Sequence, residues 1–308
     1  MSNEKMPCTN GIICVNKPQD FTSFDVVAKM RGMAKIKRCG HAGTLDPMAT
    51  GVLPIFFGTA TRACDILPDG DKRYTASFKL GVTTDTLDIT GKVLSQKQSS
   101  VTKEQIEAVL GDFRGEIEQV PPMFSAVQVG GQRLYDLARQ GIEVERKPRK
   151  VTVFLLELLN FDEKTQSGEL DIKCSRGTYI RSIIADMGEC LGSGAIMTSL
   201  VRTQAAGFSL DDCITLEQAQ ELTNEGMLLD KILPIDRVFA EYPKIYLCQA
   251  QSRMFLNGVK LDLNRVKFKH ENTVHTVYSD QKEFMGLAVT DTEKMELVIY
   301  KMFMLKGE

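Results

Sequence analysis

The chain has 308 residues, of which 43% are hydrophobic and 25% are charged, and its formal net charge at pH 7 is −2. These values are typical of a folded globular protein of about two domains and exclude a largely disordered chain. No stretch approaches the ~20 apolar residues of a membrane span. The first residues lack the basic start and the apolar run of a signal peptide, so we expect a cytoplasmic protein.

The eight cysteines and three histidines show no metal-binding spacing, because no C-x-x-C pair and no acidic cluster accompanies them. A disulfide framework is not expected in a chain of this length without an export signal. We therefore expect buried free thiols and no structural metal.

The N-terminal quarter of the chain predicts strands that enclose a helix and a loop. GIICVNKP at 11–18 predicts a short strand, and Ser23 is the expected N-cap of a helix over about 24–34. Residues 39–51 carry three glycines and a proline, and they predict a loop that leads into a buried strand, VLPIFFG. The alternating residues 73–81 predict a further strand.

Two Thr-x-x-Gln sequences further along the chain predict capping boxes that open helices. The first begins at Thr102, and its helix should stop at Gly111. The second begins at Thr215, and its helix should cover about residues 216–225.

The segment between these helices contains an excursion from the main sheet. Residues 123–131 predict a strand that ends in a Gly130-Gly131 turn, and the residues after it are polar and basic. The apolar pattern resumes at VTVFLLELLNF, so we expect residues 125–150 to form a mobile arm. A strand over 168–175 and a helix over about 178–191 follow.

The pattern changes after Pro234, and from residue 244 onward short strands surround one short helix at about 249–257. The predicted strands are KIYLC, RVKFKH, TVHTVYS, FMGLAVT and MELVIYKMFML. The sequence thus predicts a larger domain over residues 1–235 and a small β-rich domain over residues 244–308.

Three separated clusters of basic residues, at 29–38, 146–150 and 265–270, contrast with the slightly negative net charge. Any one of them alone is better explained as a solvated face. Together they favour a long polyanion, such as a nucleic acid, that lies across one face of the protein.

Several common enzyme signatures are missing from the sequence. GSGAIM at 192–197 lacks the third glycine of a dinucleotide fingerprint, and the chain has no G-x-x-x-x-G-K-[ST] phosphate loop. It also has no G-x-S-x-G nucleophile elbow. We therefore expect a reaction that needs no cofactor.

One loop carries a candidate catalytic carboxylate. Asp46 lies in GHAGTLDPMATG directly before Pro47, which favours an extended backbone and fixes the direction of the Asp46 side chain. The glycines allow the backbone to approach a ligand closely. Such a carboxylate is a candidate nucleophile or base. From spacing alone, an Asx-type turn that caps its own loop is the better explanation.

The loop and its flanks, RCGHAGTLDPMATG, closely resemble the signature of the bacterial tRNA pseudouridine-55 synthases, the TruB family. Other segments resemble that family in the same order: NKPQDFTSFDVV, DKRYTASFKLGVTTDTLDITG, CSRGTYIRSIIADMGECLGSGA and LVRTQAAGF. The similarity runs from residue 11 to about residue 235. It implies an α+β pseudouridine synthase fold, with a mixed and mainly antiparallel sheet flanked by helices. The β-rich residues 244–308 are similar in position and size to the PUA-like RNA-binding domain of that family.

The resemblance implies conversion of uridine 55 in the T loop of tRNA to pseudouridine, after the base has been flipped out of its stack. Asp46 is the implied catalytic carboxylate, and it would attack the ribose C1′ or help to remove a C2′ proton. Arg181 matches the family arginine that keeps this carboxylate ionised, so we expect it to hold the pKa of Asp46 down. We also expect the planar guanidinium of Arg181 to orient Asp46 through two hydrogen bonds.

The resemblance also implies residues that contact the substrate. Tyr74 and Tyr179 match the pocket tyrosines that stack on the base, Leu200 matches a residue lining the base site, and Tyr74 is also a candidate for proton transfer. His41 resembles the histidine that fills space vacated in the T loop, with a hydrogen-bonded loop histidine as the alternative. For Lys17, a phosphate contact and a structural pairing are equally good explanations.

The implied partner is the T arm of tRNA, whose phosphates the 125–150 excursion and the basic 29–38 helix would grip. The chain resembles the stand-alone bacterial enzymes, so we expect a monomer with no guide RNA, no partner protein and no membrane contact. Two other classes stay open. One is a hydrolytic glycosylase, in which water captures the sugar, and the other is a non-catalytic RNA-binding or RNA-folding protein.

Overall fold

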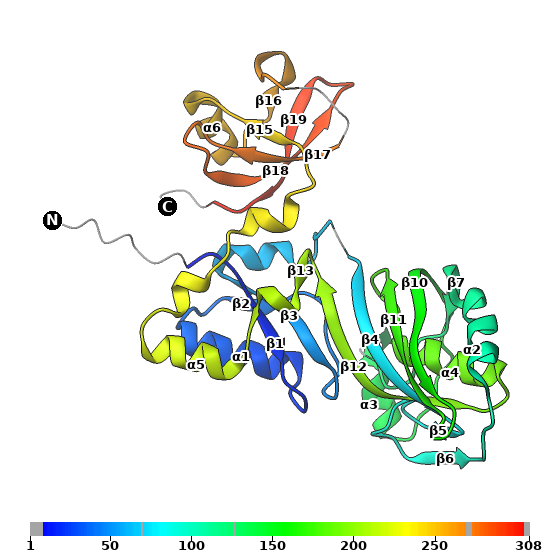
Figure 1. The fold of residues 1–308 in the computed structure, drawn as a ribbon. Coiled ribbons are helices and arrows are strands. Elements are labelled where there is room, and N and C mark those ends of the chain that lie inside the picture. Colours follow the sequence, from blue (N-terminus) through cyan, green and yellow to red (C-terminus); the bar gives the residue numbers. More distant parts are fainter. Residues whose placement is uncertain (1–8, 69, 126, 269–272, 305–308) are drawn as a thin grey trace.

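The computed structural model describes residues 9–68, 70–125, 127–268 and 273–304 (Figure 1). Its main body is a 10-stranded sheet. In chain order these strands are β1 (Gly11–Lys17), β2 (Cys39–His41), β3 (Thr50–Phe57), β4 (Lys72–Leu80), β7 (Gly115–Gln119), β10 (Arg149–Asp162), β11 (Ser167–Cys174), β12 (Ala195–Ala205), β13 (Phe208–Ser209) and β14 (Cys213–Ile214).

The strand order in this sheet is β14-β1-β3-β12-β4-β11-β10-β7, with β2 paired to β3 and β13 paired to β12. The pairs β1·β14 and β3·β12 are parallel, and the other pairs are antiparallel. This arrangement confirms the predicted mixed, mainly antiparallel sheet. The strands β3, β12 and β4 stand side by side at its centre.

Helices cover the two halves of the sheet. The helices α1 (Ser23–Ala34) and α5 (Leu216–Asn224) share a hydrophobic core with β1 and β3. The helices α2 (Lys103–Val109) and α4 (Ile180–Cys190) share another core with β4, β10, β11 and β12. In Figure 1 the long strands β4 and β12 run between the two halves. No helix in the described part of the chain is long and apolar enough to cross a membrane.

Short elements connect these larger ones. Two small two-stranded sheets join β5 (Val82–Thr84) to β6 (Val93–Gln96) and β8 (Gln128–Val129) to β9 (Gln132–Arg133). The remaining short helices of the main body are α3 (Leu134–Arg139), η1 (Gly58–Ala63), η2 (Leu110–Phe113), η3 (Leu210–Asp212), η4 (Leu228–Lys231) and η5 (Ile235–Phe239).

Both predicted capping boxes are confirmed. The Thr102 and Thr215 side chains each accept a hydrogen bond from the amide three residues later, and the glutamine there bonds back to the threonine amide. The first of these helices passes into η2 at Leu110, one residue before its predicted stop. Local capping is readable from sequence because both partners lie within one turn.

The predicted N-cap of α1 is wrong by one residue. Thr22, not Ser23, has the extended backbone of an N-cap, and its hydroxyl accepts from the amide of Asp25 at 3.1 Å. The Asp25 carboxylate accepts from the amide of Thr22 at 2.9 Å, which completes a capping box. This arrangement leaves the Ser23 hydroxyl free for a tertiary contact.

The predicted loop over 39–51 is shorter in the structure. Residues 39–41 form β2, which pairs with the end of β3 from Cys39 opposite Phe57 to His41 opposite Ile55. Only residues 42–49 are irregular. The neighbouring buried strand supplies hydrogen-bond partners that override the weak local preference of these glycine-rich residues.

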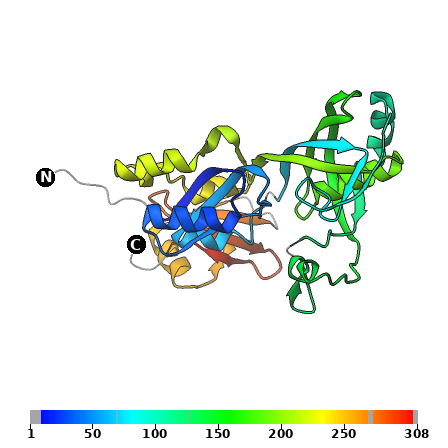
Figure 2. The same cartoon turned by 90° about the horizontal axis from the view of Figure 1, so that it is seen from below.

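The excursion leaves the main sheet between β7 and β10, and Figure 2 shows it as a separate arm. The predicted strand over 123–131 is wrong for its first part, because strand pairing covers only Gln128–Val129. The amide of Ser125 turns back to the carbonyl of Met123 at 2.9 Å, which interrupts an extended run.

The C-terminal part forms a separate five-stranded sheet in the order β15-β17-β18-β19-β16. Its elements are β15 (Lys244–Tyr246), α6 (Gln249–Leu256), β16 (Leu261–Asp262), η6 (Leu263–Arg265), β17 (Val274–Tyr278), β18 (Phe284–Asp291) and β19 (Glu296–Met302). The prediction of a strand over RVKFKH is wrong for residues 265–268, which are the part of it that the structure describes. Arg265 ends η6, which Asp262 caps through the amide of Asn264 at 2.9 Å, and 266–268 are irregular. Residues 269 and 270 lie outside the described residues.

The small sheet packs on the main body through residues near the linker. Phe239 of η5 lies among Phe284 and Phe303, with ring centroids 6.2 and 5.6 Å away. Arg62 donates a hydrogen bond to the carbonyl of Met302 at 2.8 Å, which joins η1 to β19. Figure 1 shows the small sheet above the half of the main sheet that contains β1 and β3.

The seven described cysteines are free thiols, and Cys8 lies outside the described residues. The expectation of buried thiols is confirmed for Cys14 and Cys174, whereas Cys39, Cys64 and Cys213 are half-buried and Cys190 and Cys248 are exposed. Cys190 is the last residue of α4, and Cys248 is the N-cap of α6, so both lie where a helix meets solvent.

Candidate active site

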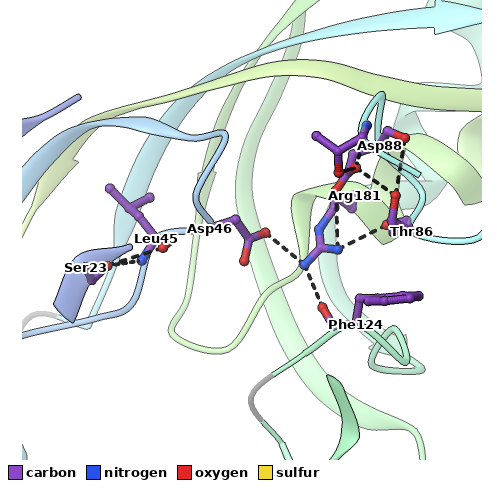
Figure 3. Close-up of polar contacts among 8 residues, drawn as sticks. Ser23, Leu45, Asp46, Thr86, Asp88, Phe124 and Arg181 are labelled. Atoms are coloured by element: carbon purple, nitrogen blue, oxygen red, sulfur yellow. Dashed lines mark hydrogen bonds and ion pairs between the residues drawn. The ribbon is translucent and has the colours of Figure 1, made fainter. Parts of the chain in front are cut away.

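The candidate catalytic loop, residues 42–49, joins β2 to β3 and is anchored from the first turn of α1. The hydroxyl of Ser23 donates to the carbonyl of Leu45 at 3.2 Å and accepts from the Leu45 amide at 2.9 Å (Figure 3). The Leu45 side chain is buried in the main core. The residue directly before Asp46 is therefore held by both its backbone and its side chain.

A second anchor holds the residue directly after Asp46. Lys17, at the end of β1, is fully buried, and its ammonium donates to the carbonyls of Pro18, Phe21 and Pro47 at 2.8, 2.6 and 3.1 Å. Burial lowers the pKa of Lys17 to about 8, although Asp46 opposes this shift. These contacts favour the structural pairing of Lys17 over a phosphate contact, because three chain carbonyls take its three donors.

Asp46 points toward α4, where Arg181 contacts it (Figure 3). Nη2 of Arg181 lies 2.8 Å from Oδ2 of Asp46 and also donates to the carbonyl of Phe124 at 2.9 Å. Nη1 donates to the carbonyl of Thr86 at 3.0 Å. The expectation of two hydrogen bonds to Asp46 is therefore wrong, because backbone carbonyls of two other segments share the guanidinium.

Asp88 is a site residue that the sequence reasoning missed. Its Oδ2 lies 3.5 Å from Nη1 of Arg181, so the guanidinium stands between two carboxylates. Its Oδ1 accepts from the hydroxyls of Thr86 and Thr90 at 2.7 and 2.6 Å and from the Thr90 amide at 3.0 Å. The signal available in the sequence was the position of Asp88 two residues after Thr86 and two residues before Thr90 in TTDTLDITG.

The pKa of Asp46 is raised above its ordinary value. Burial is the largest cause, Arg181 lowers the pKa, and the charge of Asp88 raises it. Arg181 thus acts on the pKa of Asp46 in the expected direction, but the pKa is raised overall because one shared ion pair does not offset burial and a second carboxylate. The Asp46 side chain is still 39% exposed, so a substrate can reach it.

Tyr74 and Leu200 lie on the adjacent central strands β4 and β12. Leu200 pairs with Ala76, two residues from Tyr74, and both side chains belong to the core that contains Leu45 and Ile180. Burial raises the pKa of Tyr74 to about 12, so the phenol keeps its proton at neutral pH. The fold thus brings Tyr74, Leu200 and the residue before Asp46 into one cluster.

Tyr179 is the N-cap residue of α4 and is half-buried, two residues before Arg181. The side chain of Gln119 in β7 accepts from the Tyr179 amide at 2.9 Å and donates to the Tyr179 carbonyl at 3.1 Å. These two hydrogen bonds fix the backbone of Tyr179 at the start of α4, where the Tyr179 side chain itself forms no capping hydrogen bond. The sequence reasoning did not identify Gln119.

His41 lies on β2 and faces a largely buried environment. Its Nδ1 is buried and has no hydrogen-bond partner among the residues that the structure describes. Burial lowers the pKa of His41, so the ring is neutral at pH 7. A hydrogen bond with the backbone of Gly43 opposes this shift of the His41 pKa, so both explanations of His41, the T-loop contact and the hydrogen-bonded loop histidine, stay open.

The basic clusters are partly neutralised by neighbouring acids. In the second cluster Lys150 pairs with Glu116 at 2.9 Å and Arg146 with Glu143 at 3.2 Å. In the third, Arg265 lies 3.6 Å from Asp262, while Lys269 and His270 lie outside the described residues. The first cluster keeps four exposed cations, Lys29, Lys35, Lys37 and Arg38.

Within the described ranges, no group of three or more histidine, cysteine, aspartate or glutamate side chains is placed to hold a metal ion. The two carboxylates that the site brings together, Asp46 and Asp88, are bridged by Arg181 instead.

The chain matches two family models. The N-terminal domain of the TruB family pseudouridylate synthases matches residues 31–180, and the C-terminal domain of tRNA pseudouridylate synthase B matches residues 181–240. The two matches together cover Asp46, Arg181 and Leu200. Residues 241–308 lie beyond both.

Similar proteins extend over almost the whole chain. A protein of Clostridium tetani named tRNA pseudouridine synthase B is 42% identical over 291 residues, which is 94% of this chain and 98% of that protein. A protein of the same name from Dehalococcoides mccartyi is 41% identical over 285 residues, which is 92% of this chain and 93% of that protein.

The fold is also similar to that of a chain in the crystal structure of a Cbf5-Nop10-Gar1 complex, with a TM-score of 0.75 and 25% identity. This similarity covers 98% of the present chain and 87% of the other. The two family matches and the full-length relatives at about 40% identity lead to one assignment: this chain belongs to the TruB family of pseudouridylate synthases.

Proposed function

We propose that this chain converts uridine 55 in the T loop of tRNA to pseudouridine. The observation that carries the proposal is the ion pair of Asp46 and Arg181, in which a partly exposed carboxylate stands on a loop anchored on both sides. Preorganised charges of this kind stabilise a transition state without reorganisation during the reaction. The full-length relatives named tRNA pseudouridine synthase B support the reaction class.

The proposed reaction is an isomerisation. The bond from N1 of uracil to C1′ breaks, the bond from C5 to C1′ forms, C5 loses a proton and N1 gains one. Nothing is oxidised or reduced, so the residues themselves can carry the reaction. Asp46 acts at the sugar, either by attack on C1′ or by assistance in removing the C2′ proton, and Arg181 orients it.

The flipped base would lie against the side chains that cluster beside Asp46. Tyr74 and Tyr179 offer aromatic surfaces for stacking, which offsets the cost of unstacking the base. Leu200 lines the same pocket from β12. Tyr74 retains its proton at neutral pH and is the candidate for proton transfer.

Two surfaces near this site suit an RNA backbone. On α1, Phe24 is 67% exposed, and the guanidinium of Arg31 lies 6.0 Å from its ring. In the excursion, Tyr135 stands between the guanidinium groups of Arg133 and Arg139, at 5.8 and 5.5 Å. Aromatic rings beside cations combine base stacking with phosphate contacts.

The proposal includes an organisation of the whole chain. Residues 1–235 form the catalytic domain, the excursion at about 125–150 grips RNA, and residues 244–308 form a PUA-like RNA-binding domain. The protein acts on the T arm as a monomer without guide RNA or protein partner, and it works in the cytoplasm, where bacterial tRNA is modified. The separate five-stranded sheet and the projecting excursion support this division.

A tritium-release assay tests the function. The protein is incubated with tRNA transcript labelled at C5 of uridine, and chemical mapping locates the product. We expect release of one tritium per tRNA and a single pseudouridine at position 55. A transcript with cytidine at position 55 is the control and should release none. Free uracil among the products would show hydrolysis and contradict the proposal.

A further inference from the structure

A buried cation that the sequence reasoning did not single out lies behind the catalytic loop. Arg202, on β12, has no exposed surface. In the sheet, Arg202 lies opposite Gly51 of β3 on one side and opposite Tyr74 of β4 on the other. Arg202 therefore lies between the strand that continues from the catalytic loop and the strand that carries Tyr74.

The Arg202 side chain holds the backbone on both sides of Asp46. Its Nη2 donates to the carbonyl of Gly43 at 3.1 Å, and its Nε donates to the carbonyl of Val52 at 2.8 Å. Gly43 has a φ of +75°, and a β-carbon at this position would lie 3.4 Å from Nη1 of Arg202. The glycine thus allows the loop to close tightly onto the guanidinium.

The charge of Arg202 has no acidic partner within the described ranges of the chain. Its Nη1 is buried without an acceptor in good hydrogen-bond geometry among the same residues, and the neighbouring Tyr74 side chain acts on the pKa of Arg202 as a hydrogen-bond partner. Desolvation lowers the pKa of Arg202, as expected for a cation in an apolar setting. A buried charge without a counter-ion is costly, so its position calls for a functional explanation.

The charge of Arg202 acts on three groups of the candidate site and on the neighbouring Lys72. Arg202 lowers the pKa of Tyr74, in opposition to burial, and it contributes to the lowered pKa values of Lys17, His41 and Lys72. Of these four groups, only Tyr74 becomes negatively charged when it loses a proton. Arg202 therefore favours negative charge at or next to Tyr74.

We propose that Arg202 is a positioning residue of this enzyme, which fixes the Asp46 loop through Gly43 and Val52 and directs positive charge toward Tyr74. The inference rests on the proposed function. When the bond from N1 to C1′ breaks, its electron pair stays with the uracil. A cation held behind Tyr74 lowers the free energy of that negative charge without contacting the base.

The test compares Arg202→Lys and Arg202→Gln with the parent enzyme. The lysine variant keeps the positive charge but cannot donate to the carbonyls of both Gly43 and Val52. The glutamine variant keeps a hydrogen-bond donor but loses the charge. Arg114→Lys is the matched control, because Arg114 also donates from Nε and Nη2 to a backbone carbonyl, that of Leu156, at 3.0 and 2.7 Å. Single-turnover rate, dissociation constant for tRNA and thermal unfolding are measured for each.

We expect Arg202→Lys to slow the single-turnover rate by about 10²-fold, since a displacement of about 1 Å at a reacting group has such an effect. The dissociation constant for tRNA should change less than about twofold, because phosphate contacts elsewhere supply the affinity. Arg202→Gln should be slower still, and Arg114→Lys should match the parent. A parent-like rate in Arg202→Lys, or a loss in affinity that accounts for the whole defect, would overturn the proposal.

A double-mutant cycle with Tyr74→Phe separates positioning from a general loss of structure. If Arg202 acts partly through Tyr74, the double variant should lose less than the product of the two single losses. A loss equal to that product would overturn the assignment to Tyr74. If Arg202→Gln does not fold, the Arg202→Lys variant and its double-mutant cycle with Tyr74→Phe test the proposal. An inactive parent would refute the proposed function, whereas an active parent with an unaffected Arg202→Lys would refute only this inference.

Discussion

Arg181 contacts Asp46 through Nη2 alone, at 2.8 Å, while the same nitrogen donates to the carbonyl of Phe124 and Nη1 donates to the carbonyl of Thr86. Arg181 thus ties the catalytic loop to the turn that contains Asp88 and to the start of the excursion. Its role depends on the planar spread of its donors and not only on its charge.

Arg181→Lys should therefore lose about 10²-fold in single-turnover rate although it keeps the positive charge. A lysine ammonium on a flexible stem cannot reach Asp46 and both carbonyls in one geometry. The tRNA dissociation constant should change little. A variant that turned over like the parent, or one whose defect lay wholly in affinity, would show Arg181 to be a phosphate contact or a purely structural residue.

Asp46→Asn should abolish turnover and leave tRNA affinity nearly unchanged, since the proposed reaction at the sugar depends on the Asp46 carboxylate. The variant should also be at least as stable as the parent at pH 7. The folded-state pKa of Asp46 is raised, so its stabilising contribution is complete at low pH and is lost as pH rises through that pKa. Thermal unfolding and tritium release together check this prediction. Measurable turnover by Asp46→Asn would remove the catalytic role.

Asp88→Asn should move the acid limb of the pH–rate profile to lower pH. The Asp88 charge raises the pKa of Asp46, so removal of that charge allows Asp46 to ionise at a lower pH. Asparagine keeps an oxygen for the Thr86 and Thr90 donors. Single-turnover rates at saturating enzyme between about pH 4.5 and 8 give the profile. An unmoved limb, or one moved to higher pH, would mean that Asp88 does not act on Asp46 through its charge.

Binding of tRNA should weaken as salt rises, by about 10²-fold between 50 and 200 mM if roughly four phosphates are contacted. The double substitution of Lys147 and Arg149 by Gln should reduce the slope, because both side chains are exposed. Lys150→Gln is the matched control and should have a smaller effect, because Glu116 already pairs with Lys150 at 2.9 Å. A dissociation constant that does not depend on salt would show that these cations are hydrated surface side chains that contact no phosphate.

Gly51→Ala should destabilise the fold by at least about 2 kcal/mol. Gly51 has a φ of +107°, and a β-carbon there would lie 2.2 Å from the carbonyl oxygen of Arg202, so β3 and β12 would have to separate. Gly32→Ala in α1 is the opposite case, because no atom lies within 4 Å of its added β-carbon. It should stabilise the protein by about 0.5–1 kcal/mol. Chemical denaturation of both variants decides whether the close approach at Gly51 is real.

Features that depend on residues adjacent in the chain could be predicted from the amino-acid sequence alone. The capping boxes at Thr102 and Thr215 were readable because each closes within one turn of the chain. The loop that carries Asp46 was readable because glycines and a proline disfavour regular secondary structure, and Pro47 restricts the backbone of the residue before it. Family resemblance then added roles for Arg181, Tyr74 and Leu200, whose own spacing does not assign them.

The ion pairs and hydrogen bonds that form across the sheet are visible only in the folded chain. Asp88 meets Arg181 from a distant turn, and Arg202 reaches Gly43 because β12 pairs with β3. The raised pKa of Asp46 likewise comes from burial and from a second carboxylate that no local pattern reveals. Strand pairing brings these residues together, and the desolvation that follows sets their electrostatics, so neither could be inferred before the chain was seen folded.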